Sequence, residues 1–260
     1  MNVSNGLCAM ILIALLASGV DARGAISLSG TRLIFDGHDP EVFIEVRNRG
    51  KGEALLQTWL SDPRDSDDTP HNLRKSLPFA ITPPLVRLTA GGRQTLRVLY
   101  QGQGMPQQRE SLLHLYVLEV PRRQQGIRQL NIAVRQRINV FYRPPDLDGD
   151  PADTAGKLLW TLNSGNAGSH LFTVSNPTPY HASLQGLRMD GVLFSDHLLL
   201  APGEHFQLVL PKSFLPSANT LFSYGALTDY GGQRGYCVRV NGQATYRARL
   251  LEKNVFQEEC

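Results

Sequence analysis

The feature that most constrains the fold is a two-residue period in the apolar positions. From Gly24 onward, short segments rich in Val, Ile, Leu and Phe recur between turn signals such as Asp36-Gly37 and Gly91-Gly92. Alternation of this kind is typical of half-buried β-strands, and no segment of convincing length has the period of an α-helix. We therefore expect an all-β protein.

Strand-like segments in the first half of the chain are short and regularly spaced. They lie at residues 25–35, 42–46, 54–60, 79–81, 85–88, 95–100, 112–120 and 130–142. Such spacing indicates a β-sandwich of immunoglobulin-like topology. The pattern stops at Arg143-Pro144-Pro145, and the acidic, turn-rich stretch from Asp146 to Asp153 is typical of a domain linker.

A second set of strand-like segments follows this linker. They lie at residues 158–162, 171–174, 183–189, 193–200, 206–210, 226–230, 236–240 and 244–251. The sequence therefore predicts two sandwich domains, with boundaries at 23–144 and 155–260 and a linker at 145–154. A chain of 260 residues suits two domains.

The first residues differ from the rest. Leu7 to Val20 carries no charge and is followed by small residues up to Ala22. The run is short for a membrane span and suits the apolar core of a signal peptide, which we place at residues 1–22. The alternatives are an N-terminal membrane anchor and a mis-called start codon. The net charge of +3 is too small and too dispersed to indicate nucleic-acid binding.

Removal of a signal peptide would leave two of the three cysteines, Cys237 and Cys260. Disulfides persist in exported proteins, so we expect these two to form one that ties the C-terminal tail to a strand. The alternative is two unpaired thiols.

Sequence signals for catalysis or metal binding are weak. Asp146, Asp148 and Asp150 have the spacing of the first calcium ligands of an EF-hand, but Gly149 is misplaced and Lys157 occupies the position of the essential Glu. No His pair has the spacing of a zinc helix, and the G-x-S-x-G motif of a serine nucleophile is absent. We expect neither an enzyme, nor a cofactor, nor a metal site.

One strand-like segment allows two interpretations. Leu130, Ile132 and Val134 alternate on one face of the segment that ends at Tyr142. They either fill the sandwich core or form an exposed apolar row at a sheet edge. An exposed edge of this kind is a hazard unless it is kept for pairing with a partner.

Six motifs, in order, resemble the periplasmic pilus chaperones, a PapD-like family. The first domain contributes the segments TRLIFDG (31–37), TPPLVRL (82–88), MPQQRES (105–111) with the apolar strand after it, and VFYRP (140–144). The second domain contributes NPTPY (176–180) and DYGG (229–232). The motifs span nearly the whole mature chain.

The resemblance implies two immunoglobulin-like β-sandwich domains, arranged as a boomerang with a cleft between them. It also implies that the seventh strand of the first domain complements a fimbrial subunit that lacks its own final strand. Leu130, Ile132 and Val134 would form this donor row. Glu110, Arg143 and Asp229 would form an ion-pair network between the domains.

In the family, two basic residues of the cleft anchor the C-terminal carboxylate of the subunit. The first corresponds to Arg32, but the position of the second, normally Lys, is occupied by Asn139. Arg137, on the same face of the strand and about 7 Å away, is the candidate that would compensate. Gln108 and Met105 also depart from the motif.

The resemblance further implies a periplasmic chaperone that stabilises fimbrial (pilin) subunits and delivers them to an outer-membrane usher, without stable membrane insertion. The short connection from Pro121 to Leu130 resembles the short-loop members, which serve rod-like or tipped pili. Alternatives are an atypical chaperone-like adaptor in fimbrial assembly and an exported immunoglobulin-like structural or adhesive subunit. Self-association of the free protein stays open.

Overall fold

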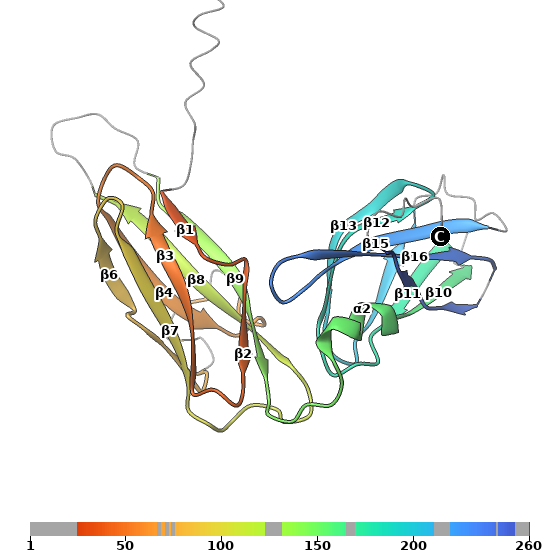
Figure 1. Cartoon of the computed structure of the whole chain (residues 1–260), viewed down its shortest axis with the longest axis horizontal. Coiled ribbons are helices and arrows are strands. Elements are labelled where there is room, and N and C mark those ends of the chain that lie inside the picture. The colour runs from red at the N-terminus through yellow and green to blue at the C-terminus, as the bar shows by residue number, and fades with distance from the viewer. Residues whose placement is uncertain are drawn as a thin grey trace, which may run out of the picture.

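The computed structural model describes residues 25–66, 69–70, 73, 76–122, 132–164, 170–210, 219–242, 244–252 and 260. It consists of two β-sandwich domains that are joined at one end and diverge from there (Figure 1). The expected all-β, two-domain architecture is confirmed. The expected signal peptide and Leu130 lie outside the described residues.

The N-terminal domain packs two sheets face to face, with strand orders β1-β3-β7-β5 and β2-β9-β8-β4-β6. The strand pairs in both sheets are antiparallel, except that β2 pairs with β9 in parallel. Its strands are β1 (Ile26–Leu28), β2 (Arg32–Asp36), β3 (Glu41–Asn48), β4 (Ala54–Ser61), β5 (Phe79–Thr82), β6 (Leu85–Leu88), β7 (Arg93–Tyr100), β8 (Ser111–Pro121) and β9 (Val134–Arg143).

Alternation along β9 shows how sequence determines the two faces of its sheet. Ile138, Val140 and Tyr142 are buried in the core, whereas Arg137 points outward and is exposed. Successive side chains of a strand point to opposite faces, so the core-facing residues all share one parity.

The expected single strand at 25–35 is wrong, because the chain divides it between two sheets. β1 pairs with β3, and β2 pairs with β9 in the other sheet. The crossing falls at Gly30, where a Cβ would come within 3.2 Å of the Arg32 carbonyl oxygen. A side chain at this position would therefore be crowded by the backbone of the turn.

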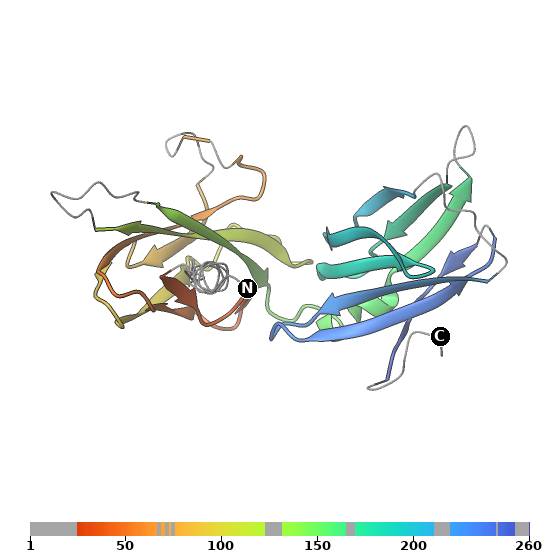
Figure 2. The same cartoon turned by 90° about the horizontal axis from the view of Figure 1, so that it is seen from above.

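The C-terminal domain is a second sandwich, with strand orders β14-β11-β10-β17 and β13-β12-β15-β16-β18. Its strands are β10 (Leu159–Ser164), β11 (His170–Ser175), β12 (Ala182–Met189), β13 (Val192–Leu200), β14 (His205–Val209), β15 (Thr220–Leu227), β16 (Gln233–Val240), β17 (Thr245–Tyr246) and β18 (Arg249–Leu250). Trp160 lies fully buried at the centre of its core and stacks on Phe172. Figure 2 shows the two sandwiches from above.

Two expected strands of this domain differ from the structure. The segment 226–230 is not one strand, since β15 ends at Leu227 and a turn follows, closed by a hydrogen bond from Thr228 N to Gly232 O (2.8 Å). The segment 244–251 is divided between β17, which pairs with β10, and β18, which pairs with β16. A continuous apolar pattern does not reveal where a strand changes sheets.

A short helical turn that sequence periodicity missed lies where the expected linker meets the second domain. A 3-10 helix, η2 (Pro151–Asp153), is followed by α2 (Thr154–Lys157). The side chain of Asp150 accepts a hydrogen bond from Ala152 N, and Pro151 occupies the first position. Both features favour a helix start, but four residues are too few for a periodic signal.

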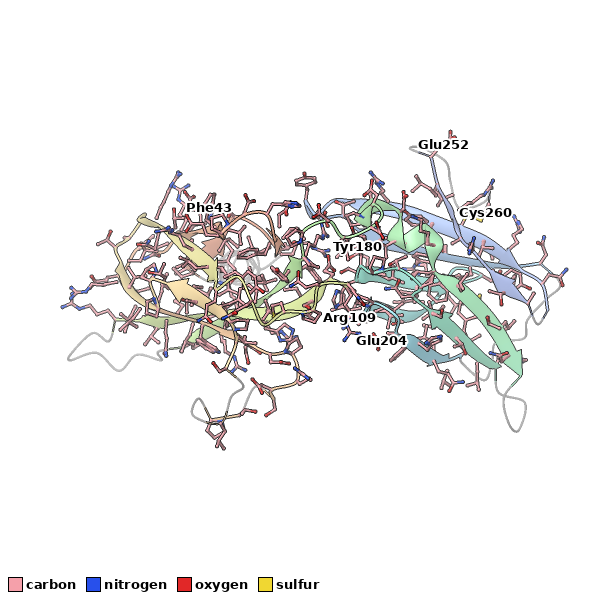
Figure 3. The ribbon with its side chains drawn as sticks, turned by 90° about the horizontal axis from the view of Figure 1, so that it is seen from below. Phe43, Arg109, Tyr180, Glu204, Glu252 and Cys260 are labelled. Carbon is pink, nitrogen blue, oxygen red and sulfur yellow. A yellow bond between two sulfur atoms is a disulfide. The ribbon has the colours of Figure 1, made fainter. Side chains whose placement is uncertain are left out.

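The C-terminal residue is tied to the second domain. A disulfide joins Cys237 of β16 to Cys260, with the two Cα atoms 6.0 Å apart; Figure 3 labels Cys260. Within the described residues, no helix has the length and apolarity that a membrane crossing requires.

Candidate functional site

An ion-pair network joins the two domains. Arg143, at the end of β9, donates from Nε to Glu110 Oε2 (2.6 Å) and from Nη1 and Nη2 to the two oxygens of Asp229 (2.7 and 2.8 Å). Burial alone would lower the pKa of Arg143, but the hydrogen bonds and charges of Asp229 and Glu110 outweigh it, and the pKa is raised. The structure thus brings together the three residues that the resemblance selected.

The network has further members that the sequence reasoning missed. Glu110 Oε1 lies 2.9 Å from His181 N and 2.8 Å from His181 Nδ1, and Glu110 N donates to Pro179 O (2.8 Å). Arg143 also lies over the ring of Tyr180, 5.4 Å from its centre. Figure 3 labels Tyr180, which lies where the two domains meet. Since the NPTPY motif includes Pro179 and Tyr180 and directly precedes His181, its position in the sequence was the available signal.

A cavity of about 340 Å³ lies between the domains, and Arg32 lines it. Arg32 Nη1 donates to Ser183 Oγ of the other domain (3.4 Å), and its guanidinium lies 5.8 Å from the centre of the Phe141 ring. Burial lowers the pKa of Arg32, and the charges of Asp229 and Glu110 oppose this. Arg32 Nε is buried and has no hydrogen-bond partner within the described residues. An arginine with donors to spare at a cavity suits an anionic ligand.

The other two expected anchor residues lie differently. Asn139 is the register partner of Arg32 on β2 and of His114 on β8, so it neighbours Arg32. Arg137 is exposed and lies opposite Tyr116. Neither Asn139 nor Arg137 is among the residues that line the cavity.

β9 has an incompletely covered edge. From Val134 to Tyr142 it pairs with β8, but on the other side β2 pairs only with Asn139–Arg143. Within the described residues, the stretch from Val134 to Ile138 therefore has no strand partner on that side. Ile132, just before β9, is 63% exposed, and Val134 is partly buried. The expected strand began too early, because β9 starts at Val134.

The described residues contain no group of three His, Cys, Asp or Glu side chains arranged to hold a metal ion. The polar groups of the site instead satisfy one another across the domain boundary or face the cavity.

Two family models match the chain. Residues 25–148 match "Pili and flagellar-assembly chaperone, PapD N-terminal domain", and residues 153–237 match "Pili assembly chaperone PapD, C-terminal domain". The chain is 34% identical over 239 residues to the probable fimbrial chaperone YadV of Escherichia coli K12, covering 88% of this chain and 94% of that protein. It is 33% identical over 225 residues to the chaperone protein FimB/FhaD of Bordetella pertussis, covering 83% and 88%.

Solved structures agree with this similarity. The crystal structure of the YadV chaperone superimposes with a TM-score of 0.65 at 29% identity, covering 84% of this chain and all (100%) of that one. The SafB chaperone, solved in complex with the SafA pilin of Salmonella enterica, superimposes with a TM-score of 0.71 at 25% identity, covering 85% and 99%. The two family models match in the expected order, and the similarity to YadV extends over nearly the full length of that protein. The chain therefore belongs to the PapD family of pili assembly chaperones.

Proposed function

We propose that the protein is a periplasmic chaperone of the chaperone–usher pathway that holds fimbrial subunits by lending them the edge of β9. The observation that carries this proposal is the stretch Val134–Ile138, which pairs with β8 on one side only among the described residues. A free edge supplies main-chain donors and acceptors for an incoming strand, and adjacent apolar side chains fill pockets in the partner. Ile132 is available for that purpose.

The family and its solved members support a fimbrial subunit as the partner. SafB is a chaperone in complex with a pilin, and YadV is named a probable fimbrial chaperone. Leu130, Ile132 and Val134 would enter the subunit, and burial of three aliphatic side chains would contribute about 5–9 kcal/mol before association costs are subtracted. Arg32 would bind the C-terminal carboxylate of the subunit, the network around Arg143 would fix the angle between the domains, and an outer-membrane usher would receive the complex.

The experiment is co-purification of a fimbrial subunit co-expressed with variants of the chaperone. Ile132→Asp would place a charge in an apolar pocket of the subunit, and we expect it to abolish co-purification. The chaperone should stay folded, because Ile132 is exposed in the free protein. Phe43→Asp is the matched control, because Phe43 is 62% exposed on β3 whereas Ile132 is 63% exposed. Undiminished co-purification with Ile132→Asp would contradict strand donation.

A further inference from the structure

Two arginines from opposite domains line the interdomain cavity without a carboxylate partner. Arg32 comes from β2, and Arg234 comes from β16. Neither forms an ion pair with any residue in the described ranges. Two guanidinium groups at one cavity offer several donors to a single anion, and arginine forks suit carboxylates in particular.

The other charged groups at the cavity are already engaged. Glu110 and Asp229 direct their oxygens to Arg143, and Glu110 also meets His181. Asp150 accepts a hydrogen bond from Ala152 N (2.8 Å) at the start of η2. The carboxylates that line the cavity therefore have partners, and the two remaining guanidiniums have donors left over.

Arg234 is held in place by its own domain. Its strand pairs with β15, and Arg234 is the register partner of Ala226, which also lines the cavity. Burial raises the pKa of the Tyr236 hydroxyl, and the adjacent Arg234 guanidinium, which hydrogen-bonds to it, opposes that rise. The Arg234 side chain is exposed, so it lies where a ligand can reach it.

Arg32 is oriented by the domain that carries Arg234. Its Nη1 donates to Ser183 Oγ on β12, and its guanidinium lies over Phe141. The orientation of Arg32 thus depends on how the second domain sits. A binding site formed by both arginines would exist only when both domains are in place.

The direction of β9 indicates which anion would arrive. β9 runs toward the cavity, because Arg143 at its end lines it. On the uncovered side, β2 already pairs with β9 in parallel. A strand added along Val134–Ile138 in the same direction would bring its carboxyl end to the cavity. A volume of about 340 Å³ is sufficient for a chain end, and lies near the lower end of the range for ligand sites.

We propose that Arg234 of the C-terminal domain supplies the second cation of a carboxylate subsite whose first cation is Arg32, and that its ligand is the free C-terminus of the bound polypeptide. This inference rests on the proposed function, since it assumes that a partner strand runs along β9. It assigns to the second domain a contact that the sequence assigned to Asn139 or Arg137 on β9.

The test is an NMR titration of the arginine Nε–H resonances of the full two-domain protein. The probes are N-acetyl-glycyl-phenylalanine with a free carboxylate and the same dipeptide as its C-terminal amide. We expect the acid, and not the amide, to shift the resonances of both Arg32 and Arg234 with one common Kd. Arg234→Gln should weaken binding of the acid about tenfold, the loss expected for one charge-assisted hydrogen bond. Arg247→Gln, the same change at an exposed arginine that lines a different cavity, should leave the Kd unchanged.

The outcomes separate this inference from the proposed function. An unmoved Arg234 resonance overturns the inference, whether or not Arg32 responds. An unchanged Kd of the free-acid dipeptide in Arg234→Gln also overturns it. So does weaker binding of that dipeptide by Arg137→Gln when Arg234→Gln binds it as the wild type does. In each of these cases strand donation would still be judged by the Ile132→Asp co-purification, which does not involve Arg234.

Discussion

Replacing Arg143 by Met tests how strongly the two domains are coupled. The substitution keeps much of the side-chain volume and removes the hydrogen bonds to Glu110 and Asp229. The Asp229 side chain is 33% exposed and can be hydrated again, whereas the Glu110 side chain is 1% exposed and cannot. Breaking a buried pair on one side typically costs about 3–5 kcal/mol. Because Asp229 recovers water and Glu110 keeps His181, we expect the lower end, about 3 kcal/mol.

The assay is urea unfolding followed by tryptophan fluorescence. The two tryptophans, Trp59 and Trp160, lie in different domains, so each reports one sandwich. In the wild-type protein we expect the two transitions to be coupled through the network. In Arg143→Met we expect the first domain, whose buried Glu110 has lost Arg143, to unfold at lower urea and the two transitions to separate.

The control is Arg97→Met, which breaks the pair between Arg97 and Glu41 within the first domain. These side chains are 50% and 25% exposed, and an exposed pair of this kind contributes less than about 1 kcal/mol. If Arg143→Met destabilises the protein no more than Arg97→Met does, burial of Glu110 is not what makes the network strong. The reasoning from its geometry would then be refuted.

Three further changes test other parts of the structure. Asn139→Lys places a cation beside Arg32, so we expect about tenfold tighter binding of the free-acid dipeptide in the NMR titration; an unchanged Kd would contradict this. Burial raises the pKa of Glu119, because the buried side chain favours its protonated form. Glu119 therefore stabilises the fold fully at a pH below its usual pKa of about 4.3, and this contribution is lost as the pH rises through the raised pKa. Glu119→Gln should therefore unfold at higher urea than the wild type at pH 8, an advantage that shrinks in acid, and a constant difference would argue against burial as the cause. Reducing the Cys237–Cys260 disulfide, whose sequence separation is 23, should destabilise the second domain by about 3 kcal/mol in urea with dithiothreitol; a reductant without effect on that transition would show that the bond does not constrain the unfolded chain.

Sequence periodicity located most strands because each buries one face. β8 was expected at 112–120 and spans Ser111–Pro121, and β12 was expected at 183–189 and spans Ala182–Met189. The failures are places where the chain changes sheets, as between β1 and β2, or forms a single helical turn, as in α2. An alternating pattern continues through a change of sheet because both sheets face the same core.

The site was foreseeable only where a motif carried it. Glu110, Arg143 and Asp229 belong to motifs that the family shares, and the structure joins them. His181 had only its position directly after the NPTPY motif as a signal, and Ser183 had none, since ordinary alternation along β12 explains it as a strand residue. Arg234 could not be predicted either. It lines a cavity that exists only because the two domains lie against each other, and the sequence does not show how the domains are arranged.

The parallel pairing of β2 with β9 has a consequence for the order in which the protein assembles. Arg32 belongs to the first strands of the chain, yet its register partner Asn139 is on the last strand of the same domain. A contact between the two ends of a domain closes a long loop and forms late in folding. If the chain crosses a membrane amino end first, β2 with Arg32 is exported before β9. It cannot form its parallel pairing until β9 follows. Under the proposed function, a molecule whose β9 has not yet been exported would have neither the donor edge nor an anchored Arg32, so it could not bind a subunit before its own first domain was complete.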